Sequence, residues 1–245
     1  KTDELKRYKP SPTDEARWGL AVIEDSLWNA VPKICSRLDN AVEQYSGKRL
    51  PNDYSPFRFG SWMGGDRDGN PNVDHTITRE VLLLSRWEAA NLYEKEFTKI
   101  IEDLSIYECS KEIKKFTGKS QEPYRMYLRP IRNKLKNTQK EIENYLIENI
   151  NLNEKLLVNS ISEIINPLKV VYSSLCKAKC KSIADGSVLD LLRRAYSFGL
   201  NLAKVDIRQE ASRHISLIEK IYNKKNKKNF TELNENQKIS FLIKS

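Results

Sequence analysis

A glycine-rich, charged segment holds the first group of residues suited to binding an anion. In SWMGGDRDGNPN (residues 61–72), Arg67 stands between Asp66 and Asp68, a few residues after Trp62. A guanidinium binds phosphate or carboxylate through paired hydrogen bonds, and neighbouring carboxylates can hold it in place. Two roles are therefore open for Arg67: an ion pair that shapes the loop, or a contact with an anionic ligand.

A second charged segment lies near the other end of the chain. In VDIRQE (residues 205–210), Arg208 is separated by one residue from Asp206 and from Glu210. Arg208 is either an anion ligand or the ion-pair partner of one of these two carboxylates.

The spacing in the first segment excludes two familiar loop types. A calcium loop that starts at Asp66 would carry Pro71 where glycine is required and Ile77 where glutamate is required. A P-loop would need a lysine followed by serine or threonine after its last glycine, and none is present. The loop glycines permit positive φ angles and close approach of a ligand to the backbone; they are Gly64, Gly65 and Gly69.

Both charged segments follow short stretches that predict β-strands. Residues 57–62 (FRFGSW) and 202–209 (LAKVDIRQ) alternate with a period of two, which is typical of strands. Each stretch leads into polar residues and then into a helical pattern, as in parallel α/β folds. In such folds ligands bind at the carboxyl ends of the strands, where both charged segments stand.

Helices are predicted for most of the remaining chain. The first begins at Ser11, an expected N-cap before Pro12, and Pro32 is expected to kink it. Periodicity predicts further helices at 76–104, 122–148, 154–182, 187–197, 209–222 and from 234 onward. The tryptophans on these apolar stripes are expected in the core; they are Trp18, Trp28 and Trp87. The predicted fold class is mainly α with a few parallel β-strands.

Composition sets limits on the function. The 245 residues include 39% hydrophobic and 31% charged residues, with a formal net charge of +9. No apolar stretch is long enough to span a membrane. No signature of a nucleic-acid-binding motif is present, so the basic run at 224–228 is interpreted as a solvated loop. The chain lacks an initiator methionine and ends within an apolar pattern, which indicates a single segment (residues 1–245) of a longer protein with no internal domain boundary.

The cysteines and histidines give no sign of a metal centre. Cys176 and Cys180 would share a helix face, but no further cysteine or histidine stands near them, so a structural zinc site is disfavoured. We interpret all four cysteines as reduced thiols, and His214 as a residue on the surface of a helix rather than a base.

Several longer segments together resemble one enzyme family. FGSWMGGDRDGNPNV (residues 59–73) closely resembles a hallmark segment of phosphoenolpyruvate carboxylase. KPSPTDEARWG (9–19), TREVLLLSRW (78–87) and VDIRQEASRH (205–214) resemble further segments of that family, in the same order and with similar spacing. The resemblance is strongest to bacterial members and weakest at 111–121, 148–160 and 223–235.

The resemblance implies a fold and a reaction. Members of the family are cytoplasmic homotetramers with allosteric regulation, built around a phosphoenolpyruvate/pyruvate-type (β/α)8 barrel with large helical insertions. They convert phosphoenolpyruvate and bicarbonate, through carboxyphosphate and an enolate, to oxaloacetate and phosphate, with Mg²⁺ or Mn²⁺. The oxaloacetate formed by this carbon dioxide fixation replenishes the tricarboxylic acid cycle. Neither nucleic acid nor a membrane is an expected partner.

The resemblance also implies roles for individual residues. Trp62 would help form the apolar pocket around the substrate's methylene, and Arg208 would hold the phosphate. The active-site loop would comprise Gly64, Gly65, Asp66, Arg67, Asp68 and Gly69, with no chemical step assigned to it. The family's TAHPTE histidine, FHGRGG loop, acidic metal ligands and catalytic lysine have no counterpart here. No catalytic residue and no metal ligand is therefore expected in this segment, which is predicted to be inactive alone.

Other interpretations of the same residues remain open at this point. Trp62 is a packing residue in most sequence contexts, and Arg208 can be an ordinary ion-pair partner. The net positive charge also permits a different class of protein, a stand-alone basic helical module that binds an acidic partner.

Overall fold

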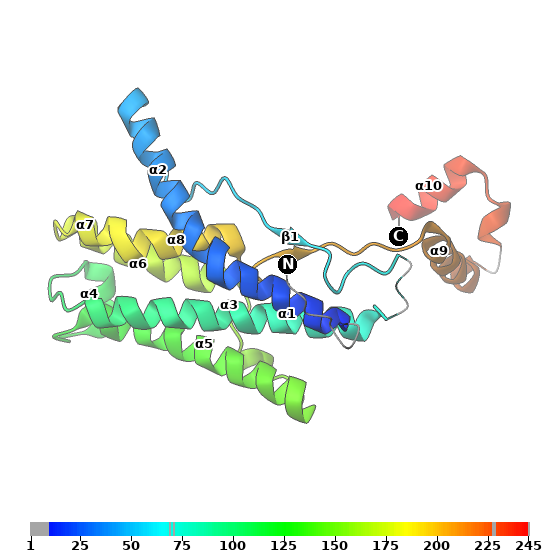
Figure 1. Cartoon of the computed structure of the whole chain (residues 1–245), viewed down its shortest axis with the longest axis horizontal. Helices are drawn as coiled ribbons and strands as arrows, with labels where there is room; N and C mark the ends of the chain where they lie inside the picture. Colours follow the sequence, from blue (N-terminus) through cyan, green and yellow to red (C-terminus); the bar gives the residue numbers. More distant parts are fainter. Residues whose placement is uncertain (1–9, 69, 71, 227–228, 245) are drawn as a thin grey trace, which may run out of the picture.

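The computed structural model describes residues 10–68, 70, 72–226 and 229–244. In the described residues the chain is mainly α-helical, with one pair of short parallel strands. Figure 1 shows a layer of long helices, the strand pair beside it, and the C-terminal helices at the far end of the molecule.

The first helix, α1 (Pro12–Val22), begins where the sequence predicts. The Ser11 hydroxyl accepts a hydrogen bond from the Asp14 backbone N–H at 3.1 Å, and the Asp14 carboxylate accepts one from the Ser11 backbone N–H at 3.1 Å. Such a capping box pairs donors that have no partner within the helix. The hydrogen bonds from Ser11 lower the pKa of Asp14 below its usual value.

A π-helical turn (Ile23–Leu27) joins α1 to α2 (Trp28–Ser46). Pro32 lies inside α2 and has no N–H, so the carbonyl of Trp28, four residues earlier, lacks its helical partner. The Nε of Arg194 donates to that carbonyl at 2.9 Å instead. The α-helix therefore continues through Pro32, and the departure from α geometry lies in the π-helical turn that precedes α2.

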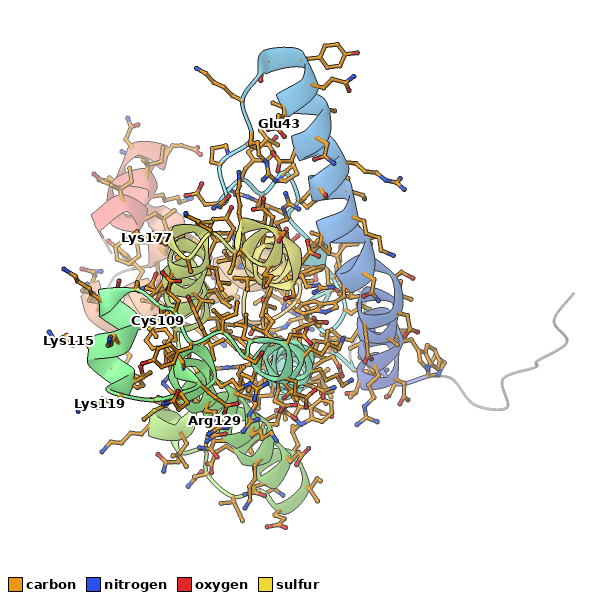
Figure 2. All side chains as sticks on the ribbon, turned by 90° about the vertical axis from the view of Figure 1, so that its left-hand side faces the viewer. Glu43, Cys109, Lys115, Lys119, Arg129 and Lys177 are labelled. Atoms are coloured by element: carbon orange, nitrogen blue, oxygen red, sulfur yellow. The ribbon has the colours of Figure 1, made fainter. Side chains whose placement is uncertain are left out.

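Two long antiparallel helices form the centre of the core. Helices α3 (His75–Asp103) and α5 (Pro123–Glu148) lie side by side along most of their length (Figure 1). Figure 2 views the molecule from the end where α4 (Lys111–Thr117) connects them, and shows side chains filling the space between the helices. The largest fully buried residues on α3 and α5 include Tyr93, Phe97, Ile100, Tyr124, Leu128 and Leu135.

The predicted helix at 154–182 begins later than expected. Residues Glu154–Leu156 form a 3-10 turn, and α6 spans only Ser162–Lys177. Between them the chain is held against the core: the Val158 backbone N–H donates to the Thr138 hydroxyl at 2.9 Å, and its carbonyl accepts from Arg86. These tertiary hydrogen bonds keep this stretch out of the helix.

The next helical segment completes the layer. A short helix, α7 (Lys181–Ile183), continues through a π-helical turn (Ala184–Val188) into α8 (Leu189–Phe198). Helix α8 packs against both α2 and α6.

A buried ion cluster fixes the start of the segment that leads to the first strand. Asp39 of α2 is 3% exposed and its Oδ2 accepts from Arg49 at 2.6 Å and from Arg193 at 3.1 Å. Its other oxygen accepts from the Leu50 backbone N–H at 2.8 Å. Arg49 also pairs with Asp185 at 2.5 Å. Residues 49 and 50 are thereby tied to α2 and α8.

Aromatic stacking holds the end of the same segment. The Phe59 ring stacks on Phe198 of α8 at 4.8 Å between centroids, and Phe57 stacks on Phe59 at 6.4 Å. The hydroxyls of Ser55 and Ser197 lie 3.0 Å apart. The chain therefore enters the first strand in a position that α8 determines.

The two strands are parallel, as predicted, but shorter than predicted. Strand β1 (Gly60–Ser61) pairs with β2 (Lys204–Val205) in the register Gly60 with Lys204 and Ser61 with Val205. A turn interrupts regular pairing directly after Ser61.

The last two helices form a separate hairpin at one end of the molecule (Figure 1). Helices α9 (Ala211–Asn226) and α10 (Glu235–Lys244) meet through the ring of Tyr222, which contacts Phe230 and Phe241 edge-on at 5.5 and 4.9 Å. Other apolar side chains of the hairpin are exposed: Ile215, Leu217, Ile221, Ile239 and Leu242.

The expectation that three helical tryptophans lie in the core is correct for one of them. Trp28 is 2% exposed, Trp87 is half-buried, and Trp18 is 46% exposed. Helix α1 packs on α3 through the face that carries Ala16 and Leu20, which leaves Trp18 on the outside.

Candidate functional site

The two charged segments meet at the carboxyl ends of β1 and β2. The Asp206 backbone N–H donates to the Ser61 carbonyl at 2.9 Å, and the Arg208 N–H donates to the Gly65 carbonyl at 3.0 Å. The Arg67 N–H returns a hydrogen bond to the Arg208 carbonyl at 2.9 Å. Parallel pairing thus resumes beyond the strands, with Asp66 opposite Arg208.

A tight turn separates the two stretches of pairing. The Trp62 carbonyl accepts hydrogen bonds from the backbone N–H groups of Gly65 at 2.9 Å and Asp66 at 3.0 Å. Residues 62–65 therefore project out of the ladder, and the Trp62 side chain is 60% exposed. The turn is the feature that presents the indole at the end of the strands.

Two loop glycines are required by the packing of the chain itself. Gly64 has φ +72°, and a Cβ there would lie 2.6 Å from Val81 Cγ2. A Cβ on Gly65 would lie 2.3 Å from the Asp206 carbonyl oxygen. The predicted positive φ is confirmed at Gly64. The close approach that the glycines permit is to α3 and β2, whereas the sequence suggested a ligand.

Met63 anchors the outside of the turn to α1. Its side chain fills the space beside Gly19, where an added Cβ would lie 2.1 Å from Met63 Cε. The Met63 backbone N–H donates to the Ser61 hydroxyl at 3.1 Å. Contacts on both sides of Trp62 therefore hold the turn in place.

Arg208 lies at the centre of a charged cluster with Trp62. Its guanidinium carbon is 5.4 Å from the centroid of the Trp62 ring, within the range of a cation–π contact. Its Nη1 lies 3.6 Å from Asp66 Oδ2, and its Nη2 lies 3.6 Å from Asp68 Oδ2. These distances exceed those of good hydrogen bonds, and the Arg208 side chain is 49% exposed. The guanidinium is thus oriented, while its N–H donors remain available to a ligand.

Arg67 points away from this cluster. Its Nη2 donates to the hydroxyl of Thr78 in α3 at 2.9 Å, and that hydroxyl lies 2.7 Å from the Gly64 carbonyl oxygen. Side chains alternate along an extended chain, so Arg67 projects to the opposite face from Asp66 and Asp68. Of the two roles left open for Arg67, the structure supports loop shaping. Arg67 acts there through its hydrogen bond with Thr78 and not through ion pairs with the flanking aspartates.

The start of α3 is fixed directly behind the loop. Asp74 is its N-cap, and Asp74 Oδ1 accepts from the backbone N–H groups of Ile77 and Thr76, each at 2.9 Å. These two hydrogen bonds hold the pKa of the Asp74 carboxyl below its usual value. The rigid cap places Thr78 where it meets Arg67.

Most of the residues expected in the site come together. Trp62, Arg208, Asp66 and Asp68 form one cluster, which we call the Arg208 cluster, while Gly64 and Gly65 form the turn beneath it. Gly69 lies outside the described residues. Arg208 forms no ion pair with Asp206 or Glu210 in the part of the chain that the structure describes.

Three residues that support the site were not identified from the sequence. Gly19 contacts the loop from α1, which is distant in the chain. The other two, Thr78 and Val81, contact it from α3, which the loop's own bend separates from it in sequence. Gly19 carried the one usable signal, since a glycine inside a predicted helix interior lowers helix stability and often has a packing reason.

The site as described contains no metal centre. Among residues 10–68, 70, 72–226 and 229–244, no three histidine, cysteine, aspartate or glutamate side chains gather in a way that could hold a metal ion. The cysteines are free thiols, and His214 is exposed on α9. In the described residues, no helix combines the length and the apolar character needed to cross a membrane.

Comparison with known proteins identifies the family. The family described as phosphoenolpyruvate carboxylase matches residues 1–245. The chain is 43% identical over 243 residues to the phosphoenolpyruvate carboxylase of Acinetobacter baylyi, covering 99% of this chain and 27% of that protein. It is also 43% identical to the phosphoenolpyruvate carboxylases of Ectopseudomonas mendocina and Vibrio vulnificus, of which it covers 27% and 28%. The chain therefore spans about a quarter of the length of these relatives, and it belongs to the phosphoenolpyruvate carboxylase family.

Proposed function

We propose that the full-length protein containing this chain forms oxaloacetate and phosphate from phosphoenolpyruvate and bicarbonate. In this reaction the C–O–P linkage of phosphoenolpyruvate is cleaved, phosphate leaves with one oxygen from bicarbonate, and a new carbon–carbon bond forms at the methylene carbon. Family membership supports this proposal, as does the shared name of the relatives. The observation that carries it is the pairing of Arg208 with Trp62 at the carboxyl ends of two parallel strands.

Arg208 is the proposed ligand of the substrate phosphate. A planar guanidinium matches two phosphate oxygens through parallel hydrogen bonds. The contacts with Asp66 and Asp68 at 3.6 Å orient the group without occupying its donors in short hydrogen bonds. A bound phosphate dianion would form shorter hydrogen bonds and replace part of this pairing.

Trp62 is the proposed apolar cover of the reacting carbon. Its indole is exposed beside Arg208, so a phosphate held by Arg208 would place the attached enol group near the ring. An apolar surface there excludes water, which would otherwise protonate the enolate before it reacts with the carboxyl carbon.

The divalent metal that the family implies does not fit the described residues. No cluster of suitable ligands is found among them, and Asp66 and Asp68 are both directed at Arg208. The ligands of Mg²⁺ or Mn²⁺ would have to come from other parts of the full-length protein. The contribution of this chain is to bind the phosphate and to cover the methylene.

The proposal extends to the architecture and setting of the full-length protein. Strands β1 and β2 would be neighbouring strands of a (β/α)8 barrel, and the helices between them an insertion. A cytoplasmic, allosterically regulated homotetramer is proposed from the family resemblance alone.

The test is an assay of the full-length protein with phosphoenolpyruvate, bicarbonate and Mg²⁺, measuring oxaloacetate and inorganic phosphate together. We expect both products in equal amounts and only with bicarbonate present. Phosphate release without oxaloacetate, or neither product, would contradict the proposal. The isolated 245-residue segment is expected to be inactive, so turnover on the order of 1–1,000 per second by the segment alone would contradict its role as a partial site.

The alternative, a basic module for an acidic partner, has less support. Figure 2 shows Lys115, Lys119, Arg129 and Lys177 spread around one end of the helical layer, on different elements. All four are exposed. They form no shared hydrogen-bonded site in the described residues, whereas the Arg208 cluster is built from two paired segments.

A further inference from the structure

A second group of charged side chains lies on the opposite face of the loop that follows β1. Because Arg67 points away from Asp66 and Asp68, its guanidinium faces a cavity of about 540 Å³ that the Arg208 cluster does not line. The cavity lies between the loop, the start of α3 and the start of α9. Its ionisable lining residues are Arg67, Asp74, His75, Glu210 and Arg213.

The two arginines of the cavity retain unused hydrogen-bond donors. Arg67 makes one side-chain hydrogen bond to the described residues, from Nη2 to Thr78, so its Nη1 has no partner among them. The Arg213 side chain makes no hydrogen bond or ion pair with any described residue, and it is exposed on the first turn of α9. The Ile77 backbone N–H and, more weakly, the charge of Arg67 lower the pKa of Asp74. Neither guanidinium forms a direct ion pair with a described carboxylate, however, and two such groups at one cavity favour an anion between them.

The two acidic residues of the cavity equal the two arginines in number but form no direct ion pair with them. Asp74 Oδ1 accepts hydrogen bonds from two backbone N–H groups at the start of α3, and Oδ2 accepts none from the described residues. Glu210 lies in the exposed segment just before α9 and forms no ion pair with Arg67 or Arg213. The volume falls within the range of small-molecule pockets and exceeds what one inorganic phosphate fills.

We infer that this cavity binds an oxyanion of the phosphate class between Arg67 and Arg213, separately from the substrate phosphate at Arg208. The ligand is either inorganic phosphate or a phosphate monoester, since both present the same three acceptor oxygens. The inference goes beyond the proposed function, because it requires neither carboxylation nor the Arg208 cluster.

The experiment measures binding by isothermal titration calorimetry on the full-length protein at low ionic strength. The probes are inorganic phosphate and glycerol phosphate, each titrated into the wild-type protein and three variants. Arg213→Gln removes one side of the site without touching the loop. Lys220→Gln is the matched control, an exposed cation further along the same helix. Arg208→Gln removes the substrate-side guanidinium.

The wild-type protein and the Lys220→Gln variant are expected to bind the probes equally well. Arg213→Gln should weaken the affinity at least about tenfold, as expected for the loss of a charge-assisted hydrogen bond. Arg208→Gln should retain this binding event. Tighter binding of glycerol phosphate than of inorganic phosphate identifies a monoester site, and the reverse identifies a phosphate site.

Three results would overturn the inference. The first is no binding of either probe to the wild-type protein at millimolar concentration. The second is unchanged affinity in Arg213→Gln. The third is complete loss in Arg208→Gln with retention in Arg213→Gln, which would assign the phosphate to the substrate pocket. None of these results depends on carboxylation, so they are distinguishable from a failure of the proposed function.

Discussion

Met63 occupies the space that Gly19 leaves open on α1. A Cβ at Gly19 would lie 2.1 Å from Met63 Cε and 2.4 Å from its Sδ, so any side chain at residue 19 would require the Met63 side chain to move. Met63 directly follows Trp62. This contact connects α1 to the loop that presents the indole.

Gly19→Ala is expected to disturb the loop more than the fold. Alanine favours the helix by up to about 1 kcal/mol, while its methyl group displaces Met63. We expect a lower kcat/KM for phosphoenolpyruvate in the full-length enzyme without a lower Tm. Adding Met63→Ala should relieve the clash, so the two substitutions should show a coupling of about 0.5–3 kcal/mol in a double-mutant cycle. Additive effects would show that the contact does not control the loop.

Arg208→Lys should keep the fold but weaken substrate use. An ammonium cannot reproduce two parallel hydrogen bonds to phosphate. We expect kcat/KM for phosphoenolpyruvate to fall at least about tenfold, equivalent to about 1.4 kcal/mol. Steady-state kinetics and Tm of Arg208→Lys and Arg208→Ala provide the check. If Arg208 only neutralises Asp66 and Asp68, the lysine variant should be nearly silent in kinetics and the alanine variant should lose stability instead.

Trp62→Ala should raise KM for phosphoenolpyruvate and lower kcat. The side chain is 60% exposed, so its removal is not expected to open a cavity in the core, and the change in stability should stay near 0.5 kcal/mol. Trp62→Phe is the matched variant, because it keeps an apolar ring and should retain more activity. Equal kinetics for wild type and Trp62→Ala would show that the indole has no part in the reaction.

Asp39→Asn should loosen the segment that leads to β1. Asp39 is 3% exposed and pairs with two arginines, so removing its charge leaves both guanidinium groups without their buried counter-ion. The expected cost is about 3–5 kcal/mol. Hydrogen exchange of residues 47–59 in the full-length protein measures the local opening. Glu43→Gln is the control. Glu43 forms an exposed ion pair with Arg49, with 3.8 Å between Glu43 Oε2 and Arg49 Nε, and such a pair is worth less than about 1 kcal/mol.

Asp74 should make the loop sensitive to acid. Its pKa is lowered in the folded state by the N–H groups of Ile77 and Thr76. A group with a lowered folded pKa stabilises the protein fully above its unfolded pKa, about 3.9, and loses that contribution as the pH falls through the folded value. Hydrogen exchange at the start of α3 should therefore rise below about pH 4 in the wild type. Asp74→Asn keeps a capping oxygen but cannot titrate there, and should show a flatter profile; identical profiles would argue against this linkage.

Local signals in the sequence were sufficient for most of the helices, for the parallel strand pair and for the residues that form the Arg208 cluster. Ser11 was predicted as the first N-cap because an N-cap and the backbone N–H that it accepts from lie within one turn. The apolar period at 76–104 predicted α3, and the alternation at 57–62 and 202–209 predicted a parallel pair. The segments at 59–73 and 205–214 predicted the family and brought Trp62 and Arg208 into one site.

Only the tertiary structure decided which charges pair. The sequence suggested Asp206 or Glu210 as the ion-pair partner of Arg208, since residues two apart share a face of a strand. Such residues are about 6.6 Å apart along the chain, whereas a neighbouring strand lies at about 4.8 Å. The register of β1 with β2 sets Asp66 opposite Arg208, so Asp66 and Asp68 become its partners and Arg67 turns to Thr78. Packing likewise placed Trp18 outside and Met63 against Gly19, because such contacts depend on how whole helices lie together and leave no local pattern in the chain.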